Sequence, residues 1–130
     1  MYVEADILYS YLKPTDWLKE SSVKILKKYK NLKTSVITIT EIELVSKRDF
    51  GEQFSNSVLE RVKDIKNIKL LDLDLNILKR AVEYRKKYGL NIFDSIHAAS
   101  AFKIKKEIIS TDSIYDLIEE IKRKDPRQIE

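Results

Sequence analysis

Acidic side chains are the groups in this sequence that could do chemistry together. Six of them stand at the end of a predicted strand or in the first turns of a predicted helix: Glu4, Asp6, Glu41, Asp94, Asp112 and Asp116. In an open parallel α/β sheet such positions meet at the carboxyl ends of the strands. Carboxylates gathered there repel one another unless a cation joins them, and hard cations prefer oxygen ligands. The sequence therefore predicts a site for Mg²⁺ or Mn²⁺.

Such a site favours phosphodiester cleavage over other hydrolytic chemistry. Two divalent ions roughly 4 Å apart can ionise a water and stabilise both the attacking and the leaving oxygen, with no histidine or cysteine involved. The chain has one histidine and no cysteine, which excludes a Cys-His pair and a zinc-binding pair of histidines. A serine triad would need His97, which lies inside a predicted helix, and we expect a structural or supporting role for it.

Each acid also has a purely structural interpretation. Asp94 and Asp112 could cap the helices that follow them, and Glu41 could complement a helix dipole. Asp72 and Asp74 are similar to the paired aspartates of haloacid-dehalogenase phosphatases, but strand alternation and an N-cap at Asp74 explain them. The joint occurrence of the six acids at predicted strand ends and helix starts favours a shared site.

Regular elements that could position these acids alternate along the chain. Apolar runs predict strands at residues 2–5, 34–39, 68–73 and 107–111. Helical patterns follow at 7–12, from 15 or 16 to 29, from 40, at 51–66, at 74–88 with Gly89 as a left-handed cap, from 94, and at 114–121. The alternation predicts a three-layer α/β/α fold with a central parallel sheet of four to five strands, and we expect residues 1–130 to form one domain.

Composition and charge indicate the kind of partner and the cellular location to expect. The 25 lysines and arginines against 21 acids give a net charge of +4. The basic residues gather in four clusters: Lys24, Lys27, Lys28, Lys30 and Lys33; Arg85, Lys86 and Lys87; Lys103, Lys105 and Lys106; and Lys122, Arg123, Lys124 and Arg127. Such clusters suit a phosphate backbone, and they also suit solvated helix faces. Without cysteine, a signal sequence or a long apolar segment, we expect a soluble cytoplasmic protein with no membrane contact.

Four segments, in order, resemble the motifs of the PIN domain, a nuclease family that includes the VapC toxins. Residues 3–8, Val-Glu-Ala-Asp-Ile-Leu, resemble the opening Asp-Thr-Asn/Ser-x-Leu, and residues 35–42 resemble Ser-x-x-Thr-x-x-Glu-Leu. Residues 91–101, with Asp-Ser-Ile-His-Ala-Ala, are similar to the family's Asp-Ala-Ile-His-Ala-Ala helix. Residues 109–116 resemble the closing Thr-x-Asp-x-x-Phe/Tyr-Asp.

This resemblance implies roles for individual residues. Glu41, Asp94 and Asp112 would be metal-site acids with Asp116 as an accessory. Ser35 and Thr111 would orient them. Glu4 aligns with the family's first aspartate, and Asp6 stands where asparagine or serine is usual. Both lie on one face of an extended strand, so both are expected to reach the metal. The residues expected to act in catalysis are Asp6, Glu41, Asp94 and Asp112.

The resemblance also implies an activity and partners. We expect a Mg²⁺- or Mn²⁺-dependent endoribonuclease, either the toxin of a toxin-antitoxin pair or an RNA-processing enzyme, that forms a homodimer. A toxin would be inhibited by an antitoxin inserted into the active-site groove. The alternative is a catalytically silent RNA-binding or scaffolding PIN domain, suggested by Glu4 in place of aspartate. A phosphoacceptor receiver domain fits less well, because Thr111 and Asp112 follow the last predicted strand, where a lysine is needed.

Overall fold

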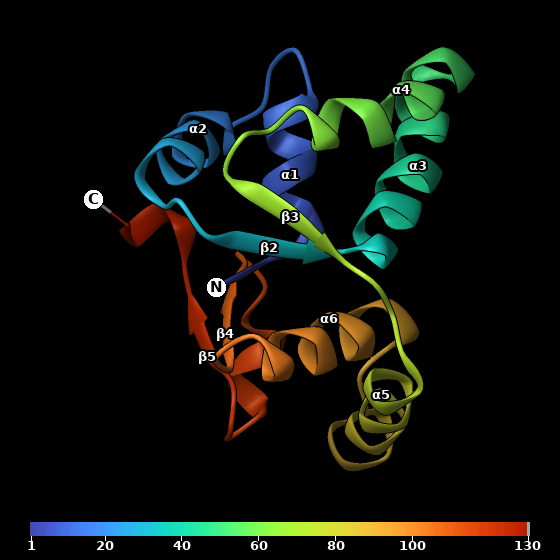
Figure 1. The fold of residues 1–130 in the computed structure, drawn as a ribbon, viewed down its shortest axis with the longest axis vertical. Coiled ribbons are helices and arrows are strands. Elements are labelled where there is room, and N and C mark those ends of the chain that lie inside the picture. The colour runs from blue at the N-terminus through green and yellow to red at the C-terminus, as the bar shows by residue number, and fades with distance from the viewer. Residues whose placement is uncertain (130) are drawn as a thin grey trace.

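A computed structural model describes residues 1–129 (Figure 1). Within these residues the strands are β1 (Tyr2–Val3), β2 (Leu32–Ser35), β3 (Ile68–Leu71), β4 (Glu107–Ile109) and β5 (Lys122–Lys124). The α-helices are α1 (Ala5–Leu12), α2 (Lys19–Lys28), α3 (Val36–Phe50), α4 (Glu52–Lys63), α5 (Leu75–Tyr88) and α6 (Ile92–Lys103). Two short 3₁₀ helices are η1 (Ser113–Leu117) and η2 (Pro126–Gln128).

The strands form one parallel sheet in the order β3-β2-β1-β4-β5. Strand β1 is central, so Tyr2 pairs with Lys33 of β2 on one side and with Ile108 of β4 on the other. Figure 1 shows α1, α2 and α4 on one side of the sheet and α5 and α6 on the other. This arrangement confirms the predicted α/β class with a parallel sheet covered on both faces.

Two apolar cores fill the space between the sheet and its helices. One is built around Ile7, Leu8 and Ile25 on the α1 and α2 side. The other contains Ile96 and the alanines of α6, such as Ala98. Small side chains let α6 lie close to the sheet, which brings the groups at its N-terminal end near the ends of the strands. None of the helices in residues 1–129 is long and apolar enough to cross a membrane.

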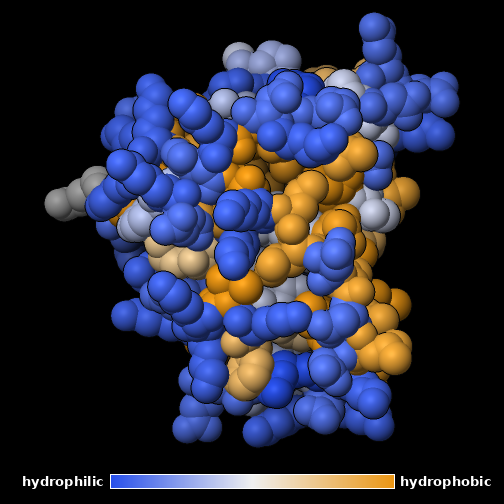
Figure 2. Space-filling model, viewed as in Figure 1, coloured by the Kyte–Doolittle hydropathy of each residue, from blue (hydrophilic) through white to orange (hydrophobic). Residues whose placement is uncertain are grey.

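Some large apolar side chains stay on the surface. Figure 2 shows apolar surface at the lower right of the molecule, over the region of α5 in Figure 1. The exposed side chains there and at the starts of α3 and α6 are Val36, Leu75, Leu78, Val82 and Ile92. Leu75 and Ile92 are the most exposed of these, at 73% and 63%.

The predicted strand at residues 34–39 and the helix start at residue 40 were wrong. Strand β2 ends at Ser35, and α3 begins at Val36. The β-branched run at 36–39 favours a strand locally, but burial in α3 falls on Thr38, Ile39, Ile42 and Ser46, which has the period of a helix. Packing of this face against neighbouring helices outweighs the weak local preference.

The predicted helix at residues 114–121 was also wrong. Only the 3₁₀ helix η1 forms there, and the chain then turns into β5, a fifth strand that the pattern did not predict. Tyr115, Ile118 and Ile121 are buried, so their spacing reflects burial without an α-helix. Backbone pairing of β5 with β4 satisfies hydrogen bonds that a helix would otherwise satisfy internally.

The cap at the end of α5 offers a test of the fold. Gly89 follows α5 with φ 71° and ψ 24°, as predicted, and a Cβ there would meet no atom within 4 Å. The cost of Gly89→Ala is therefore purely that of the left-handed backbone, and we expect a loss of about 1–2 kcal/mol in the free energy of unfolding. Urea denaturation measures it, with exposed Lys86→Ala as a control expected to stay within about 0.5 kcal/mol of wild type. Equal stabilities for all three proteins would show that the left-handed cap carries no such cost.

Candidate active site

Two acids, Glu4 and Asp6, lie where β1 passes into α1. Residues that directly follow β4 donate hydrogen bonds to both. Glu4 precedes the first turn of α1 and is only 7% exposed. The hydroxyl of Ser110 donates to Oε2 of Glu4 at 3.0 Å. The backbone N–H and the hydroxyl of Thr111 both donate to Oδ2 of Asp6, at 2.9 and 2.6 Å. The neighbouring strands β1 and β4 thus orient two carboxylates at the carboxyl edge of the sheet.

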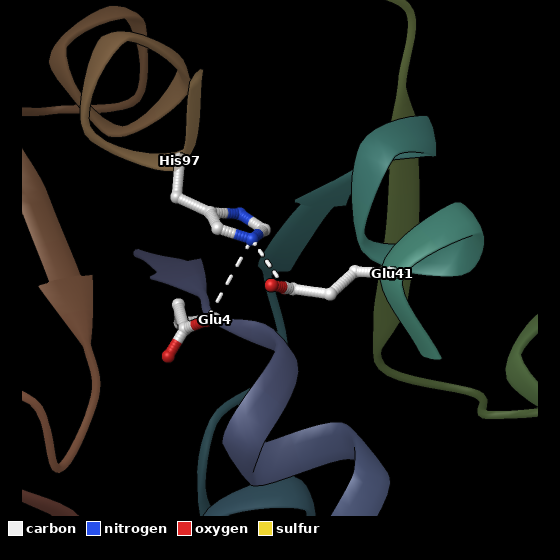
Figure 3. A group of neighbouring side chains, drawn as sticks. All are labelled: Glu4, Glu41 and His97. Atoms are coloured by element: carbon white, nitrogen blue, oxygen red, sulfur yellow. Dashed lines mark hydrogen bonds and ion pairs between the residues drawn. The ribbon is translucent and has the colours of Figure 1, made fainter. Parts of the chain in front are cut away.

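Glu41 of α3 and His97 of α6 meet Glu4 at this edge. In Figure 3 the three side chains point toward one another from three different elements. Nε2 of His97 lies 2.8 Å from Oε1 of Glu41 and 3.6 Å from Oε1 of Glu4. One ligand atom from each residue falls within 4.8 Å of the other two, which is close enough for a single ion to touch them.

A buried polar network fixes the orientation of His97. Nδ1 of its ring lies 2.7 Å from the hydroxyl of Tyr2, which also contacts the hydroxyls of Ser35 at 2.9 Å and Thr38 at 3.3 Å. The His97 side chain is fully buried, and both ring nitrogens have partners. The ring therefore lies behind Glu41 and aims its carboxylate, as a supporting residue does.

Asp94 and Asp112 extend the acidic group. Oδ1 of Asn91 accepts the backbone N–H of Asp94 at 2.8 Å, so Asn91 caps α6 and the Asp94 carboxylate is free of that task. The hydroxyl of Tyr115 donates to Oδ1 of Asp94 at 3.3 Å. Asp112 caps η1 by accepting from the N–H of Ile114 at 3.0 Å, and its side chain is exposed. The capping interpretation is thus wrong for Asp94 and holds for Asp112.

Mutual repulsion marks these acids as one electrostatic unit. Burial raises the pKa of Glu4 well above its usual value, and the charges of Asp6 and Glu41 raise it further. Burial also raises the pKa of Asp94, with added repulsion from Asp112 and Glu41. Burial lowers the pKa of His97, but the Tyr2 phenol and the carboxylates of Glu41 and Glu4 outweigh this effect and raise it well above its ordinary value.

The sixth predicted acid, Asp116, is paired with a cation of the chain. Both carboxylate oxygens of Asp116 accept hydrogen bonds from Arg123, each at 3.0 Å. The chain itself therefore neutralises Asp116. Ser35, expected to orient the metal ligands, contacts the Tyr2 hydroxyl instead of a carboxylate, whereas Thr111 bonds to Asp6 directly.

Three of the acids line a hollow together with apolar side chains. A cavity of about 200 Å³ is lined by Glu4, Asp6 and Glu41 and by apolar neighbours. The apolar lining is Ala5, Tyr9, Ile42 and Val45. An organic group could therefore lie beside the carboxylates.

The donor set fits a hard divalent cation. Carboxylate oxygens are the ligands that Mg²⁺ and Mn²⁺ prefer, and a cation would offset the burial and the like charges that raise the pKa values of Glu4 and Asp94. Oxygens of Glu4 and Glu41 lie close enough together to hold it, and Asp6, Asp94 and Asp112 are the further ligands that the sequence predicted. The His97 ring is already bonded on both nitrogens, so we place it behind the ligands.

Three supporting residues were not identified from the sequence. Tyr2, Ser110 and Tyr115 each bond to a site residue, to His97, Glu4 and Asp94 respectively. A tyrosine in an apolar run looks like a core residue, so only the fold reveals the first and third. Ser110 stands beside Thr111 and Asp112, and this polar run at the end of a predicted strand could have indicated that Ser110 belongs to the site.

Comparison with known proteins gives a consistent result. The model of the PIN domain family matches residues 1–121. The structure is similar to the Mycobacterium tuberculosis toxin VapC20, described as cleaving the sarcin-ricin loop, with a TM-score of 0.78 and 11% identity over 91% of this chain and 94% of that one. It also resembles a toxin-antitoxin complex from Klebsiella pneumoniae, with a TM-score of 0.73 and 19% identity over 98% of each chain.

A third similar structure is FitAcB from Neisseria gonorrhoeae, with a TM-score of 0.74 and 17% identity over 98% of this chain and 99% of that one. At such identities these likenesses concern the fold. No curated protein matches the sequence significantly. The resemblance inferred from the four motifs is confirmed by the family match.

Burial and like charges at Glu4 are expected to lower the melting temperature of the metal-free protein. A carboxyl whose pKa is raised in the folded state destabilises the fold as the pH rises above its ordinary pKa of 4.5. In Glu4→Gln the amide oxygen still accepts from Ser110 but the charge is gone. We expect the metal-free variant to melt about 3–5 °C higher than wild type near pH 8, a difference that shrinks toward pH 4.

Differential scanning calorimetry in EDTA measures this shift. The matched control is Glu119→Gln, which removes one exposed carboxylate and should leave the melting temperature unchanged. Added Mn²⁺ should raise the melting temperature of wild type more than that of Glu4→Gln. A Glu4→Gln protein that melts below wild type at both pH values would show that the Glu4 charge does not destabilise the fold.

Proposed function

Since this chain belongs to the PIN domain family, we propose that it is a Mg²⁺- or Mn²⁺-dependent endoribonuclease. The observation that carries the proposal is the convergence of acids from four parts of the chain on the carboxyl edge of the sheet. Burial and like charges raise the pKa values of Glu4 and Asp94 there, which is the electrostatic state that a divalent ion relieves.

Each site residue has a task that its contacts support. A divalent ion bound here would supply an activated water and stabilise charge on the phosphate. When Nε2 of the His97 ring carries a proton, it donates to Oε1 of Glu41, which leaves the second oxygen of Glu41 for a ligand role. Thr111 holds Asp6, and Tyr115 holds Asp94, so neither carboxylate must be ordered when substrate binds.

The hollow beside the acids favours a single-stranded substrate. Tyr9, Ile42 and Val45 line the same hollow as the carboxylates, and we call them the apolar wall. Bases that are unstacked in RNA loops lie against aromatic and apolar side chains, whereas paired bases do not. We therefore propose that the scissile phosphate lies at the acids and a neighbouring base lies against this wall.

The biological role proposed here is that of a cytoplasmic toxin paired with an antitoxin. The support is the structural likeness to toxin VapC20 and to chains crystallised in toxin-antitoxin complexes. A protein partner that covers the acidic hollow would block access of RNA to it.

We also propose that two copies of the chain associate. Exposed apolar side chains stand at the starts of α3, α5 and α6, among them Val36, Leu75 and Ile92, and Figure 2 shows apolar surface over the region of α5. Exposed apolar surface of this kind is typical of protein interfaces. The homodimer expected from the family resemblance would bury it.

RNA cleavage tests the proposed activity. With Mn²⁺, wild type should cut single-stranded RNA. Asp94→Asn should slow the rate at least about 100-fold, because the amide still accepts from Tyr115 but has lost the charge that holds the ion. The control Asp64→Asn makes the same change beside the opposite edge of the sheet and should cut as wild type does. Gel electrophoresis of end-labelled RNA measures the rates.

The same proteins decide between a nuclease and a silent domain. Calorimetric titration with Mn²⁺ should show binding to wild type and weaker binding to Asp94→Asn. No cleavage together with no carboxylate-dependent binding of Mn²⁺ would favour the alternative of a catalytically silent RNA-binding or scaffolding PIN domain. Equal Mn²⁺ affinity, equal melting temperature and no cleavage in both proteins would end the metal-site proposal.

Self-association has its own test. Leu75→Glu places a charge on the most exposed of these side chains, so it should shift wild-type dimer to monomer in analytical ultracentrifugation. The control Leu59→Glu changes an exposed side chain of α4, and this variant should remain dimeric. A monomeric wild type at high concentration would refute the dimer.

A further inference from the structure

A second charged site lies at the edge of the sheet opposite the acids. A cavity of about 440 Å³ opens between the amino ends of β2 and β3 and the end of α6. Figure 1 shows these segments at one edge of the sheet. Six lysines line this cavity and no acid does: Lys30, Lys33, Lys66, Lys69, Lys103 and Lys105. We call it the lysine pocket.

The chain leaves this positive charge largely uncompensated. Within residues 1–129, Lys103 is the one pocket lysine whose ammonium forms a salt bridge: its Nζ lies 2.9 Å from Oδ2 of Asp74. Lys33 and Lys69 are also register partners on the neighbouring strands β2 and β3. Like charges side by side on adjacent strands destabilise a sheet, so this pairing is a cost that the fold carries.

Backbone strain at the rim adds a second cost. Lys105 and Lys106, which join α6 to β4, have positive φ values of 53° and 59°. Glycine or asparagine adopts this left-handed region more easily than lysine does. Strained residues often mark binding sites, and Lys105 lines the pocket. The Lys106 ammonium instead lies over the Phe102 ring, 4.8 Å from its centroid.

The remaining lining suits an organic group that carries negative charge. Leu32 and Ile104 give the pocket an apolar part, and Asn31 and Asn67 add amide groups. The amide of Asn67 is fixed by donation to the carbonyl of Leu26 at 2.7 Å. The volume lies within the range of about 300–1,000 Å³ in which small molecules bind.

We propose that the lysine pocket binds clustered phosphate groups, carried either by a free nucleoside polyphosphate or by an RNA strand. Several ammonium groups that converge on one cavity match several negative oxygens, and such binding weakens steeply with salt. Because no carboxylate lines the pocket, binding there needs no divalent cation. The proposal is independent of the nuclease activity, since the acids lie at the other edge.

Two matched variants separate the pocket from general charge. Lys105→Asn and Lys106→Asn each remove one positive charge, and each puts asparagine at a position with positive φ, which reduces backbone strain. Of the two lysines, only Lys105 lines the pocket. Both proteins should fold and melt at or above the wild-type temperature. A third variant, Lys33→Gln with Lys69→Gln, removes the register pair.

Binding is measured in EDTA by calorimetric titration with ATP, with inorganic tripolyphosphate and with a short single-stranded RNA lacking terminal phosphates. Lys105→Asn and the Lys33/Lys69 double variant should each weaken binding about 10-fold or more, and Lys106→Asn should change it less than about 2-fold. The slope of log affinity against log salt should fall by about one for each contact removed.

The three ligands distinguish the sources of phosphate. Tight binding of ATP and tripolyphosphate with weak RNA binding assigns the pocket to a free polyphosphate. Pocket-dependent RNA binding with weak ATP binding assigns it to the strand. Equal weakening by Lys105→Asn and Lys106→Asn, or affinities that none of the variants changes, would overturn the proposal.

Discussion

Repulsion between carboxylates that the fold forces together is the constraint on which the rest of the structure depends. Glu4 is buried beside Asp6 and Glu41, and burial with like charges raises its pKa well above normal. A chain selected for stability alone would not gather these groups. The hydrogen bonds from Ser110 and Thr111 and the contact with His97 hold the carboxylates in place against that repulsion.

The central position of β1 makes this gathering possible. Its neighbours β2 and β4 run in the same direction, so the residues that follow all three strands reach one edge. Tyr2 sits in the middle and joins the His97 ring of α6 to Ser35 at the end of β2. One buried phenol therefore ties together the elements that carry Glu4, Glu41 and His97. The same sheet carries opposite charge at its other edge, where Lys33 and Lys69 are the second residues of β2 and β3.

Local patterns failed where burial and pairing outweigh propensity. The run at 36–39 has the composition of a strand, yet it forms the first turn of α3, because packing of the buried face of α3 outweighs the local preference. The helix places Glu41 beside His97. The stripe at 114–121 has helical spacing, yet the chain there makes η1 and then pairs β5 with β4. In both segments the apolar spacing fits more than one local conformation, and two residues that the predicted elements would have buried, Val36 and Leu117, are exposed in the structure.

The sequence by itself determined the layered α/β fold, and it predicted six acids for one shared site and a supporting role for His97, because alternating apolar runs and strand-end acids are local features. Only the tertiary structure decided how these acids are held. Tyr2, Tyr115 and Ser110 lie 95, 21 and 106 positions along the chain from the residues to which they are hydrogen-bonded. The carboxylate of Asp116 is paired with Arg123. Contacts between distant segments depend on strand order and helix placement, and no local pattern encodes those.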